Sequence, residues 1–211
     1  MAVILTIAQQ KGGAGKTTLA AHLGVAFAQT RRVALLDIDP QKSLARWFAL
    51  REQLPAAKGL ARLGFSDVSG WRLGAELDRL GRDFDMILID SAPQLTTDSR
   101  TAMRAADLVL VPIQPSPPDF WAAEGTLRLA AEERRPAYLM FNRAASASRL
   151  RQGMAAEIAE RGLSLLEAAL GNRAGFANAF ARGLGIDEAA PRSRAGAELA
   201  ALAAEIETHL P

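Results

Sequence analysis

Short, continuously apolar runs alternate along the chain with longer segments in which apolar residues recur every three or four positions. The short runs predict buried strands at residues 3–8, 33–36, 86–89, 108–113 and 138–141, and residues 60–68 are expected to hold a further short strand. The longer segments predict helices at residues 17–29, 43–54, 71–82, 120–133, 149–161, 175–182 and 194–209. Pro55 is expected to end the second of these helices, because proline cannot continue an α-helix.

Buried strands that alternate with helices predict a three-layer α/β fold, with a mostly parallel, twisted sheet covered by helices on both faces. No repeat, low-complexity tract or linker interrupts the pattern, so residues 1–211 are expected to form a single domain. Ligands of such sheets bind at the carboxyl ends of the strands. The polar segments of this chain fall at those ends: residues 11–18, 37–41, 90–93, 114–119 and 142–143. This convergence predicts one active site.

The composition narrows the class of protein. Hydrophobic residues make up 49% of the 211 positions, which is enough for a full core. The absence of cysteine excludes disulfides, thiolate metal sites and iron–sulfur ligation, and it fits a reducing cytoplasm. The first apolar run lacks the basic segment of a signal peptide and no run could span a bilayer, so a soluble, cytoplasmic protein is expected. The net charge of +2 and the pI of 9.4 permit a nucleic-acid surface without requiring one.

A glycine-rich segment lies between the first predicted strand and the first predicted helix, and it consists of Gly12, Gly13, Ala14, Gly15, Lys16 and Thr17. Backbone N–H groups of such a loop point at an anion, and the helix N-terminus beyond adds positive potential. Lys16 is expected to reach the β- and γ-phosphates of a nucleotide, Thr17 to bind Mg²⁺, and Thr18 to hydrogen-bond the α-phosphate. The general P-loop pattern is matched incompletely, because Gln10 stands where its first glycine would be. A turn without a ligand is the alternative, and the Lys-Thr-Thr sequence argues against it.

The octapeptide from Lys11 to Thr18 resembles the deviant Walker A motif of the ParA/MinD family of ATPases, whose hallmark is an extra lysine at the start. The resemblance implies a P-loop NTPase fold, ATP and Mg²⁺ as ligands, and a homodimer that encloses the nucleotide. It also implies that Lys11 contacts the partner subunit's ATP, where its charge would offset that of the transferring phosphoryl group. A solvated loop lysine is the alternative for Lys11.

Aspartates follow two of the predicted strands. Asp37 and Asp39 lie on the same side of an extended segment, because side chains alternate along it. Residues 37–41 are similar to the first switch of the family, which implies that Asp39 orients or activates the attacking water. Asp37 is expected to support Mg²⁺ hydration or the local structure, and both aspartates could instead cap the loop and the next helix. Asp90 ends a Walker B-like strand and is expected to hold Mg²⁺ through a water, and residues 90–93 look like the second switch of the family.

Two later strand ends carry further parts of the resemblance. The segment 111–119 resembles the proline-rich loop of small plasmid-type ParA ATPases, which implies that Pro115 lies near the nucleotide and the dimer interface. Asn142 and Arg143 match the strand-end Asn-Arg of the family. The match implies that Asn142 contacts the adenine ring and that Arg143 stacks nearby. An asparagine that forms a turn and an ordinary surface arginine are the alternatives.

Within the family, the resemblance favours the ParA-like members. The branches that depend on cysteine are excluded, and Tyr138 is the only tyrosine, unlike the tyrosine cluster of the related kinases. Residues 195–210 contain no lysine or arginine, so the membrane-surface helix of the MinD branch is not expected, nor is any membrane contact. The P-loop begins close to residue 1, so the N-terminal helix–turn–helix of larger members is expected to be absent.

The ParA-like branch implies an ATPase that positions or partitions a plasmid, a chromosome or a protein cluster. Its ATP-bound dimer would associate with the nucleoid through nonspecific DNA binding, and a cargo-linked, ParB-like or other partner would stimulate hydrolysis to ADP and phosphate. Salt-dependent contacts to DNA phosphates would come from C-terminal arginines, each of which could also be an ordinary surface charge. The candidates are Arg149, Arg151, Arg173, Arg182, Arg192 and Arg194.

Two other functions stay open at this point. A metabolic P-loop enzyme would need further acid–base residues, but the only histidines, His22 and His209, lie in predicted helices away from the strand ends. A non-catalytic, nucleotide-dependent scaffold is the second alternative, and the presence of Asp39 argues against it.

Overall fold

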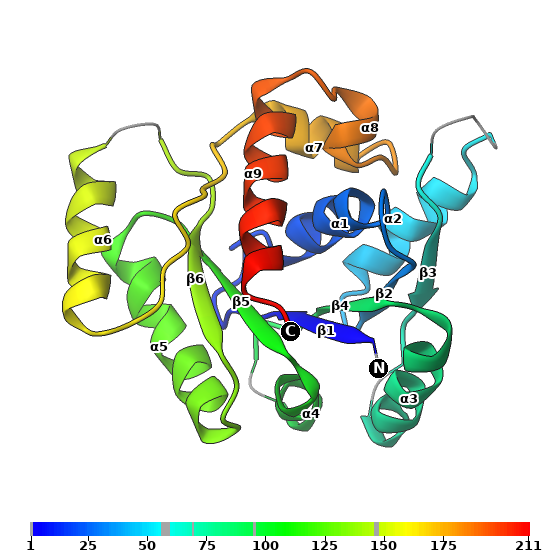
Figure 1. Ribbon diagram of the computed structural model, residues 1–211, viewed down its shortest axis with the longest axis horizontal. Coiled ribbons are helices and arrows are strands. Elements are labelled where there is room, and N and C mark those ends of the chain that lie inside the picture. The colour runs from blue at the N-terminus through cyan, green and yellow to red at the C-terminus, as the bar shows by residue number, and fades with distance from the viewer. Residues whose placement is uncertain (1, 56–59, 69, 95, 146–147) are drawn as a thin grey trace.

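A single parallel sheet forms the centre of the molecule. The computed structural model describes residues 2–55, 60–68, 70–94, 96–145 and 148–211. Its strands are β1 (Val3–Ile7), β2 (Val33–Asp37), β3 (Leu63–Ser66), β4 (Met86–Asp90), β5 (Leu108–Ile113) and β6 (Ala137–Phe141). They pair in the order β3-β2-β4-β1-β5-β6, and every pairing is parallel (Figure 1). The expected α/β sheet is confirmed, and residues 60–68 hold the expected short strand.

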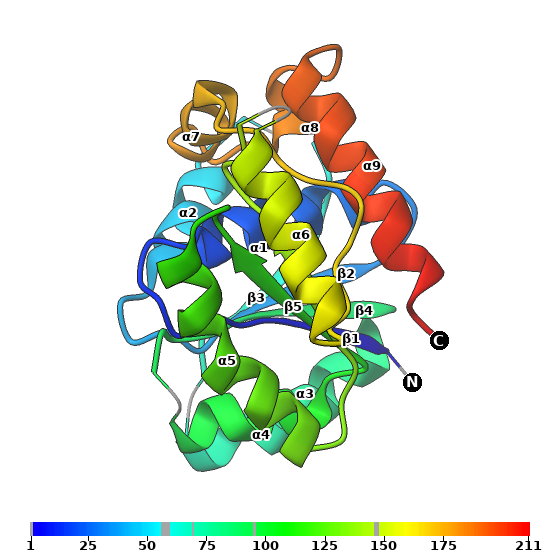
Figure 2. The ribbon, with the colours of Figure 1, turned by 90° about the vertical axis from the view of Figure 1, so that its left-hand side faces the viewer.

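Helices cover both faces of this sheet (Figures 1 and 2). One face carries α1 (Lys16–Phe27), α2 (Ser43–Glu52), α7 (Ala174–Phe180), α8 (Ile186–Ala189) and α9 (Arg194–Thr208). The other face carries α3 (Leu73–Asp83), α4 (Thr97–Ala105), α5 (Pro117–Glu132) and α6 (Arg149–Glu160). In β4, Met86 and Leu88 contribute to the first face, whereas Ile87 and Ile89 contribute to the second. Because both faces are covered, the central strands are apolar throughout.

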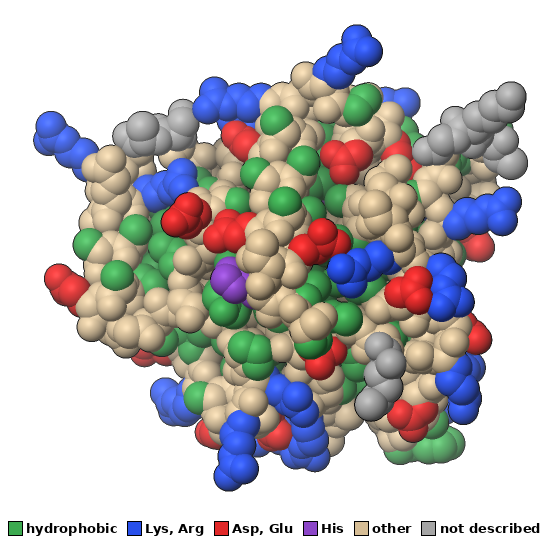
Figure 3. Space-filling view, viewed as in Figure 1, with side chains coloured by type: hydrophobic (Ala, Val, Ile, Leu, Met, Phe, Trp, Pro, Cys, Tyr) green, Lys and Arg blue, Asp and Glu red, His purple; other side chains and the backbone are tan. Residues whose placement is uncertain are grey.

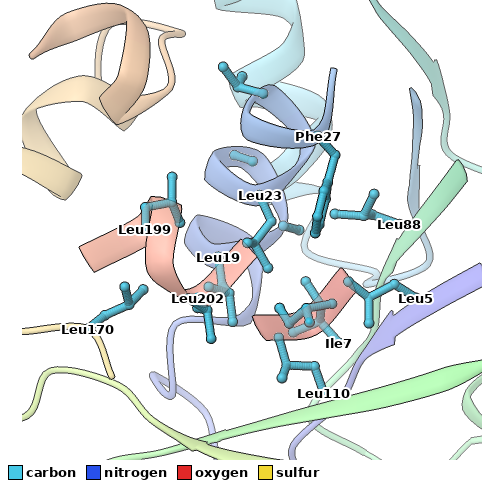
Figure 4. Close-up of a cluster of buried hydrophobic side chains, with 14 of the residues drawn as sticks. Leu5, Ile7, Leu19, Leu23, Phe27, Leu88, Leu110, Leu170, Leu199 and Leu202 are labelled. Carbon is cyan, nitrogen blue, oxygen red and sulfur yellow. The ribbon is translucent and has the colours of Figure 1, made fainter. Parts of the chain in front are cut away.

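Helix α1 lies deep in the first face, between the sheet and α9. Leu19 and Leu23 of α1 meet Leu199 and Leu202 of α9 above the side chains of β1 and β5 (Figure 4). A helix that is apolar on most of its circumference is stable only when it is buried on most sides. The packing therefore fixes α1, and with it the glycine-rich loop that immediately precedes it.

Two helices of the structure were not predicted from the sequence. Helix α4 is mostly polar, and Ser99, Ala102 and Met103 are its buried residues. The sequence feature that could have indicated α4 is its N-cap residue, Thr96. The Thr96 hydroxyl accepts the Ser99 N–H, as expected of a threonine that precedes a helix. Helix α8 is a single turn after Gly185, too short to create an apolar period. The helix expected at 71–82 begins as a 3₁₀ turn, Gly70–Arg72, before α3.

The chain after α6 covers the β6 edge of the sheet. The Leu139 N–H donates to the Ser164 carbonyl, and the Leu166 N–H donates to the Leu139 carbonyl. Further along, the Leu170 N–H donates to the Phe141 carbonyl. This extended segment leads directly into α7 beside the glycine-rich loop, so it helps to shape the site. Within the described ranges, no helix has the length and apolar character needed to cross a bilayer.

Candidate functional site

The glycine-rich loop joins β1, at the centre of the sheet, to α1. Gly13 and Gly15 adopt φ angles of 79° and 90°, in the left-handed region that glycine reaches without strain. The loop borders a groove of about 310 Å³ whose lining includes Lys16, Thr17, Thr18, Asp39, Pro93 and Arg143. The structure thus brings the predicted phosphate loop and both predicted switch segments to one groove at the carboxyl ends of the strands.

Lys16 and Asp39 line this groove and are both buried, and Asp90 is buried beneath them. Burial lowers the pKa of Lys16, and the negative charges of Asp90 and Asp39 oppose that shift. Burial raises the pKa of Asp90 to about 7, against the opposing effects of the Thr17 hydroxyl and the Lys16 ammonium. Neither carboxylate oxygen of Asp90 has a hydrogen-bond partner among the described residues. A buried carboxylate without a partner, beside a threonine hydroxyl, provides the hard oxygen ligands that Mg²⁺ prefers.

The two aspartates of the first switch segment have different surroundings. Asp37 accepts the N–H of Asp39 through Oδ1 and that of Ala45 through Oδ2, each at 3.0 Å. Both of its oxygens thus fix the turn and the start of α2, which favours the structural role among those expected for it. The Mg²⁺ role of Asp37 stays a prediction. Asp39 accepts the Gln41 N–H at 2.9 Å and lines the groove, and its role in hydrolysis stays a prediction.

Lys42 completes this segment, and sequence reasoning missed it. Its φ angle of 53° is unusual for a residue other than glycine, and it is the N-cap residue that precedes α2. The Lys42 ammonium donates to the carbonyls of Asp37 and Asp67, at 3.1 and 2.6 Å. The Lys42 side chain therefore ties the two ends of the segment 37–42 to each other and to the chain after β3.

Lys11 does not line the groove of its own phosphate loop. Its ammonium lies 2.6 Å from the Asp119 carboxylate, at the start of α5. Ser116 caps α5 by accepting the Asp119 N–H, and its hydroxyl also contacts the same carboxylate. Pro115 stands in the loop just before this cap, and it does not line either of the cavities around the P-loop in the described part of the chain. The predicted roles of Lys11 and Pro115 at a subunit interface stay predictions.

Asn142 lies against the phosphate loop. Its Nδ2 donates to the Ala14 carbonyl at 2.8 Å, and its Oδ1 accepts the Arg143 N–H at 2.9 Å. A Cβ added at Gly15 would lie 2.5 Å from that Nδ2, so glycine is required for this close approach. The amide therefore braces the loop, a contact that the adenine interpretation did not include. The contact of Asn142 with adenine stays a prediction.

A second cavity of about 170 Å³ lies beside the first turns of α1. Its lining includes Thr18, His22, Asn142, Arg143, Asn172 and Arg173. The wall from 170 to 174 was not foreseen from the sequence, because the chain there has neither an apolar period nor a known motif. Burial lowers the pKa of His22 to about 4, so this histidine is neutral, and its ring contacts the Phe176 carbonyl and the Ile186 N–H. The cavity opens next to the phosphate loop, where a base attached to bound phosphates would lie.

The arginines proposed for DNA contacts do not share one environment. Arg173 and Arg194 both pair with Glu198. The Arg151 guanidinium lies over the Phe141 ring and donates to the Glu167 carbonyl. Arg149, Arg182, Arg192 and Arg194 are exposed. The structure therefore separates Arg151 and Arg173, which are held by neighbouring groups, from four exposed arginines.

Comparisons with known proteins agree with this site. The family described as "CobQ/CobB/MinD/ParA nucleotide binding domain" matches residues 5–186. The chain is 30% identical, over 84% of its length and 82% of the relative, to "Protein ParA" of Rhizobium radiobacter. The chain belongs to the ParA/MinD family. It is thus an ATPase of this family, as the resemblance at residues 11–18 implied.

Two further similarities agree with this membership. The chain is 28% identical to "Maintenance of carboxysome distribution protein A" of Halothiobacillus neapolitanus, over 93% of this chain and 92% of that protein. The MinD structure of Pyrococcus horikoshii, described as complexed with Mg-ADP, superposes with a TM-score of 0.77 at 18% identity. The superposition covers 98% of this chain and 96% of that one, and it supports the fold.

Proposed function

We propose that this ATPase is a dimerising switch that positions or partitions a cargo. ATP drives two subunits together, the dimer binds nonspecific DNA, a cargo-linked partner stimulates hydrolysis, and the ADP form dissociates. The observation that carries the proposal is the location of Lys11. Its ammonium stands at the start of the phosphate loop, yet it contacts Asp119 and does not line the groove of its own subunit. A second subunit's triphosphate is the target that this lysine would contact once it leaves Asp119.

The chemistry of hydrolysis is assigned to the residues around the groove. Lys16 neutralises phosphate charge at the start of α1, while the loop N–H groups hold the phosphate oxygens. Asp39 orients the attacking water from the first switch segment. Thr17 and Asp90 would hold Mg²⁺, which supplies charge compensation on the phosphates when bound. Asp37 keeps the switch turn in place through its two backbone contacts.

The relatives support positioning as the biological role. Their names refer to carboxysome distribution in Halothiobacillus and to chromosome partitioning in Caulobacter, and in each case an object is distributed or partitioned. The match to the Caulobacter protein covers 60% of each chain. A cytoplasmic protein that associates with the nucleoid in its ATP form would suit either task.

Nonspecific DNA binding is assigned to the exposed arginines. Arg149, Arg182 and Arg192 form no ion pair with an acidic side chain within the described residues. On the face seen in Figure 3, basic side chains are spread around the periphery, with acidic ones between them. Contacts to phosphate need no single deep patch, but they weaken steeply with salt. Arg173 is the less suitable candidate, because Glu198 already holds it in a bidentate ion pair and its side chain is 27% exposed, whereas the Arg194 side chain is 68% exposed.

Sedimentation tests the proposal. The wild-type protein and Lys16→Gln would each be analysed with ATP, ADP and a slowly hydrolysed ATP analogue, with and without nonspecific DNA. We expect dimers and a DNA pellet only for the wild type with ATP or the analogue, and a loss of the pellet at high salt. A monomer under all conditions, or DNA binding that is independent of ATP, would contradict the proposal. ATP turnover that requires an added small-molecule substrate would instead favour a metabolic enzyme.

A further inference from the structure

Helix α9 holds the chain that follows α6 through two glutamates, one before the wall of the second cavity and one at the wall itself. Glu205 accepts the N–H groups of Glu167 and Ala168 at 2.8 and 2.7 Å. Two helical turns earlier, Glu198 accepts the Gly171 N–H at 3.0 Å. The two glutamates are seven residues apart and therefore lie on the same side of the helix. Leu199 and Leu202 anchor the helix next to α1 and Leu170 (Figure 4).

Glu198 also forms a bidentate ion pair with Arg173. The Arg173 Nε donates to Oε2 of Glu198 at 2.7 Å, and Nη2 donates to the other carboxylate oxygen. Three donors from two residues thus converge on one carboxylate, and such bidentate pairs fix the plane of the guanidinium. A Cβ added at Gly171 would lie 3.0 Å from the Arg173 nitrogens, so the guanidinium rests directly on this glycine.

Arg173 and Gly171 both line the cavity beside the phosphate loop. Glu198 does not line it, but it determines where the guanidinium lies. The side chains of Glu198 and Arg173 are 20% and 27% exposed, so the pair is shielded from water on most sides. A planar guanidinium held in one orientation is a good stacking surface for a planar ring.

We propose that Glu198 is a positioning residue for the nucleobase: it holds Arg173 and the turn at Gly171 as one wall of the base pocket. The inference rests on the proposed function in one respect, namely that the cavity beside the phosphate loop takes the base of the bound nucleotide. It assigns Arg173 to the nucleotide rather than to DNA. The C-terminal helix thereby contributes to nucleotide affinity although it does not contact the phosphate loop.

Binding measurements with two ligands separate this role from a general structural one. ADP and inorganic pyrophosphate share the diphosphate, but only ADP carries a base. Titration calorimetry would give the Kd of each ligand, with Mg²⁺, for the wild type, Glu198→Gln, Arg173→Ala and Glu205→Gln. Glu205→Gln is the matched control, because Glu205 holds the same segment from the same helix without touching Gly171 or Arg173. Thermal melting checks that each variant folds, and Arg173→Ala tests the wall even if Glu198→Gln does not fold.

We expect Glu198→Gln and Arg173→Ala to raise the Kd of ADP by about tenfold, the size of one lost charged contact. The Kd of pyrophosphate should stay within about twofold, because the phosphate loop is a separate site. Glu205→Gln should bind both ligands as the wild type does.

Other outcomes would overturn the inference. An equal loss of ADP and pyrophosphate affinity would show that the pair only stabilises the fold. An Arg173→Ala protein that binds ADP normally but no longer pellets with DNA would return Arg173 to the DNA surface. If the wild type binds ADP but never dimerises, the proposed function fails while this inference stands. If the wild type binds no ADP, both fail.

Discussion

Lys11 and Asp119 form an ion pair of 2.6 Å that joins the phosphate loop to the first turn of α5. The Asp119 side chain is 4% exposed, whereas that of Lys11 is 40% exposed. Asp119 Oδ1 has no hydrogen-bond partner among the described residues, so the contacts with Lys11 and Ser116 fall on the other oxygen. Under the proposed function, Lys11 must leave this carboxylate before it can contact a partner's phosphate. The pair therefore competes with dimerisation.

Removing the charge of Asp119 should favour the dimer. We expect Asp119→Asn to lower the protein concentration at which ATP produces dimers, because Lys11 is no longer held within its own subunit. Lys11→Gln should abolish the ATP-dependent dimer, and the double variant should behave like Lys11→Gln alone. Light scattering on a size-exclusion column measures the three variants. If Asp119→Asn weakens the ATP-dependent dimer, or if Lys11→Gln dimerises as the wild type does, the competition does not exist.

Asn142 should matter for affinity through the phosphate loop. Asn142→Ala removes the donor that holds the Ala14 carbonyl, so we expect the Kd of ADP to rise by about tenfold, as for a lost buried hydrogen bond. Asn142→Asp should bind more weakly still, because it sets a carboxylate against that carbonyl. Fluorescence titration with labelled ADP measures both. An Asn142→Ala protein with wild-type affinity would show that the brace is not needed.

The strands and the phosphate loop could be predicted because their signals are local. A run such as Met86–Asp90 is apolar because it is buried on both faces, and the glycines at 13 and 15 reflect φ angles that other residues avoid. The partners of the site could not be predicted in this way. Asp119 is 108 positions from Lys11, and Asn142 is 128 positions from Ala14. Such pairs follow from strand order, which no local pattern encodes.

Asp39 should separate binding from hydrolysis. Asp39→Asn keeps an oxygen that can accept the Gln41 N–H but loses the negative charge that would orient the attacking water. We expect ATP turnover to fall by about 100-fold or more, the usual contribution of such a group, with little change in the Kd of ADP. Asp39→Ala should lose as much turnover. Phosphate release measures the rate, and an Asp39→Asn protein that hydrolyses ATP like the wild type would remove the assigned role.

His22 should make the fold sensitive to mild acid. Burial lowers its pKa from 6.5 to about 4, against the opposing effects of the Phe176 carbonyl and the Glu188 charge. Below pH 6.5 the His22 ring is protonated in the unfolded chain, whereas in the folded chain it stays neutral down to about pH 4. The free energy of unfolding is therefore unaffected by His22 titration above pH 6.5, and it decreases as the pH falls towards 4, by about 3 kcal/mol in total.

Chemical denaturation at pH values from about 4 to about 7.5, a range that spans the folded and unfolded pKa values of His22, tests this prediction. The difference in unfolding free energy between wild type and His22→Gln should shrink as the pH falls, because the variant lacks the titrating ring. His209→Gln is the matched control, since the His209 side chain is exposed at the end of α9. A constant difference across this range would rule out the proposed linkage.

The ion pair of Arg51 and Glu188 should stabilise the junction between α2 and α8. Their side chains are 6% and 4% exposed, and Arg51 also donates to the carbonyls of Ala61 and Gly183. Arg51→Ala would leave the Glu188 carboxylate buried without its counter-ion, so we expect a loss of about 3–5 kcal/mol in unfolding free energy. The pair of Arg79 and Glu76, whose side chains are 49% and 15% exposed, is the matched control, and Arg79→Ala should cost less than about 1 kcal/mol. Denaturant titration compares the two variants, and similar losses would mean that burial of the Arg51 pair does not set its energetic importance.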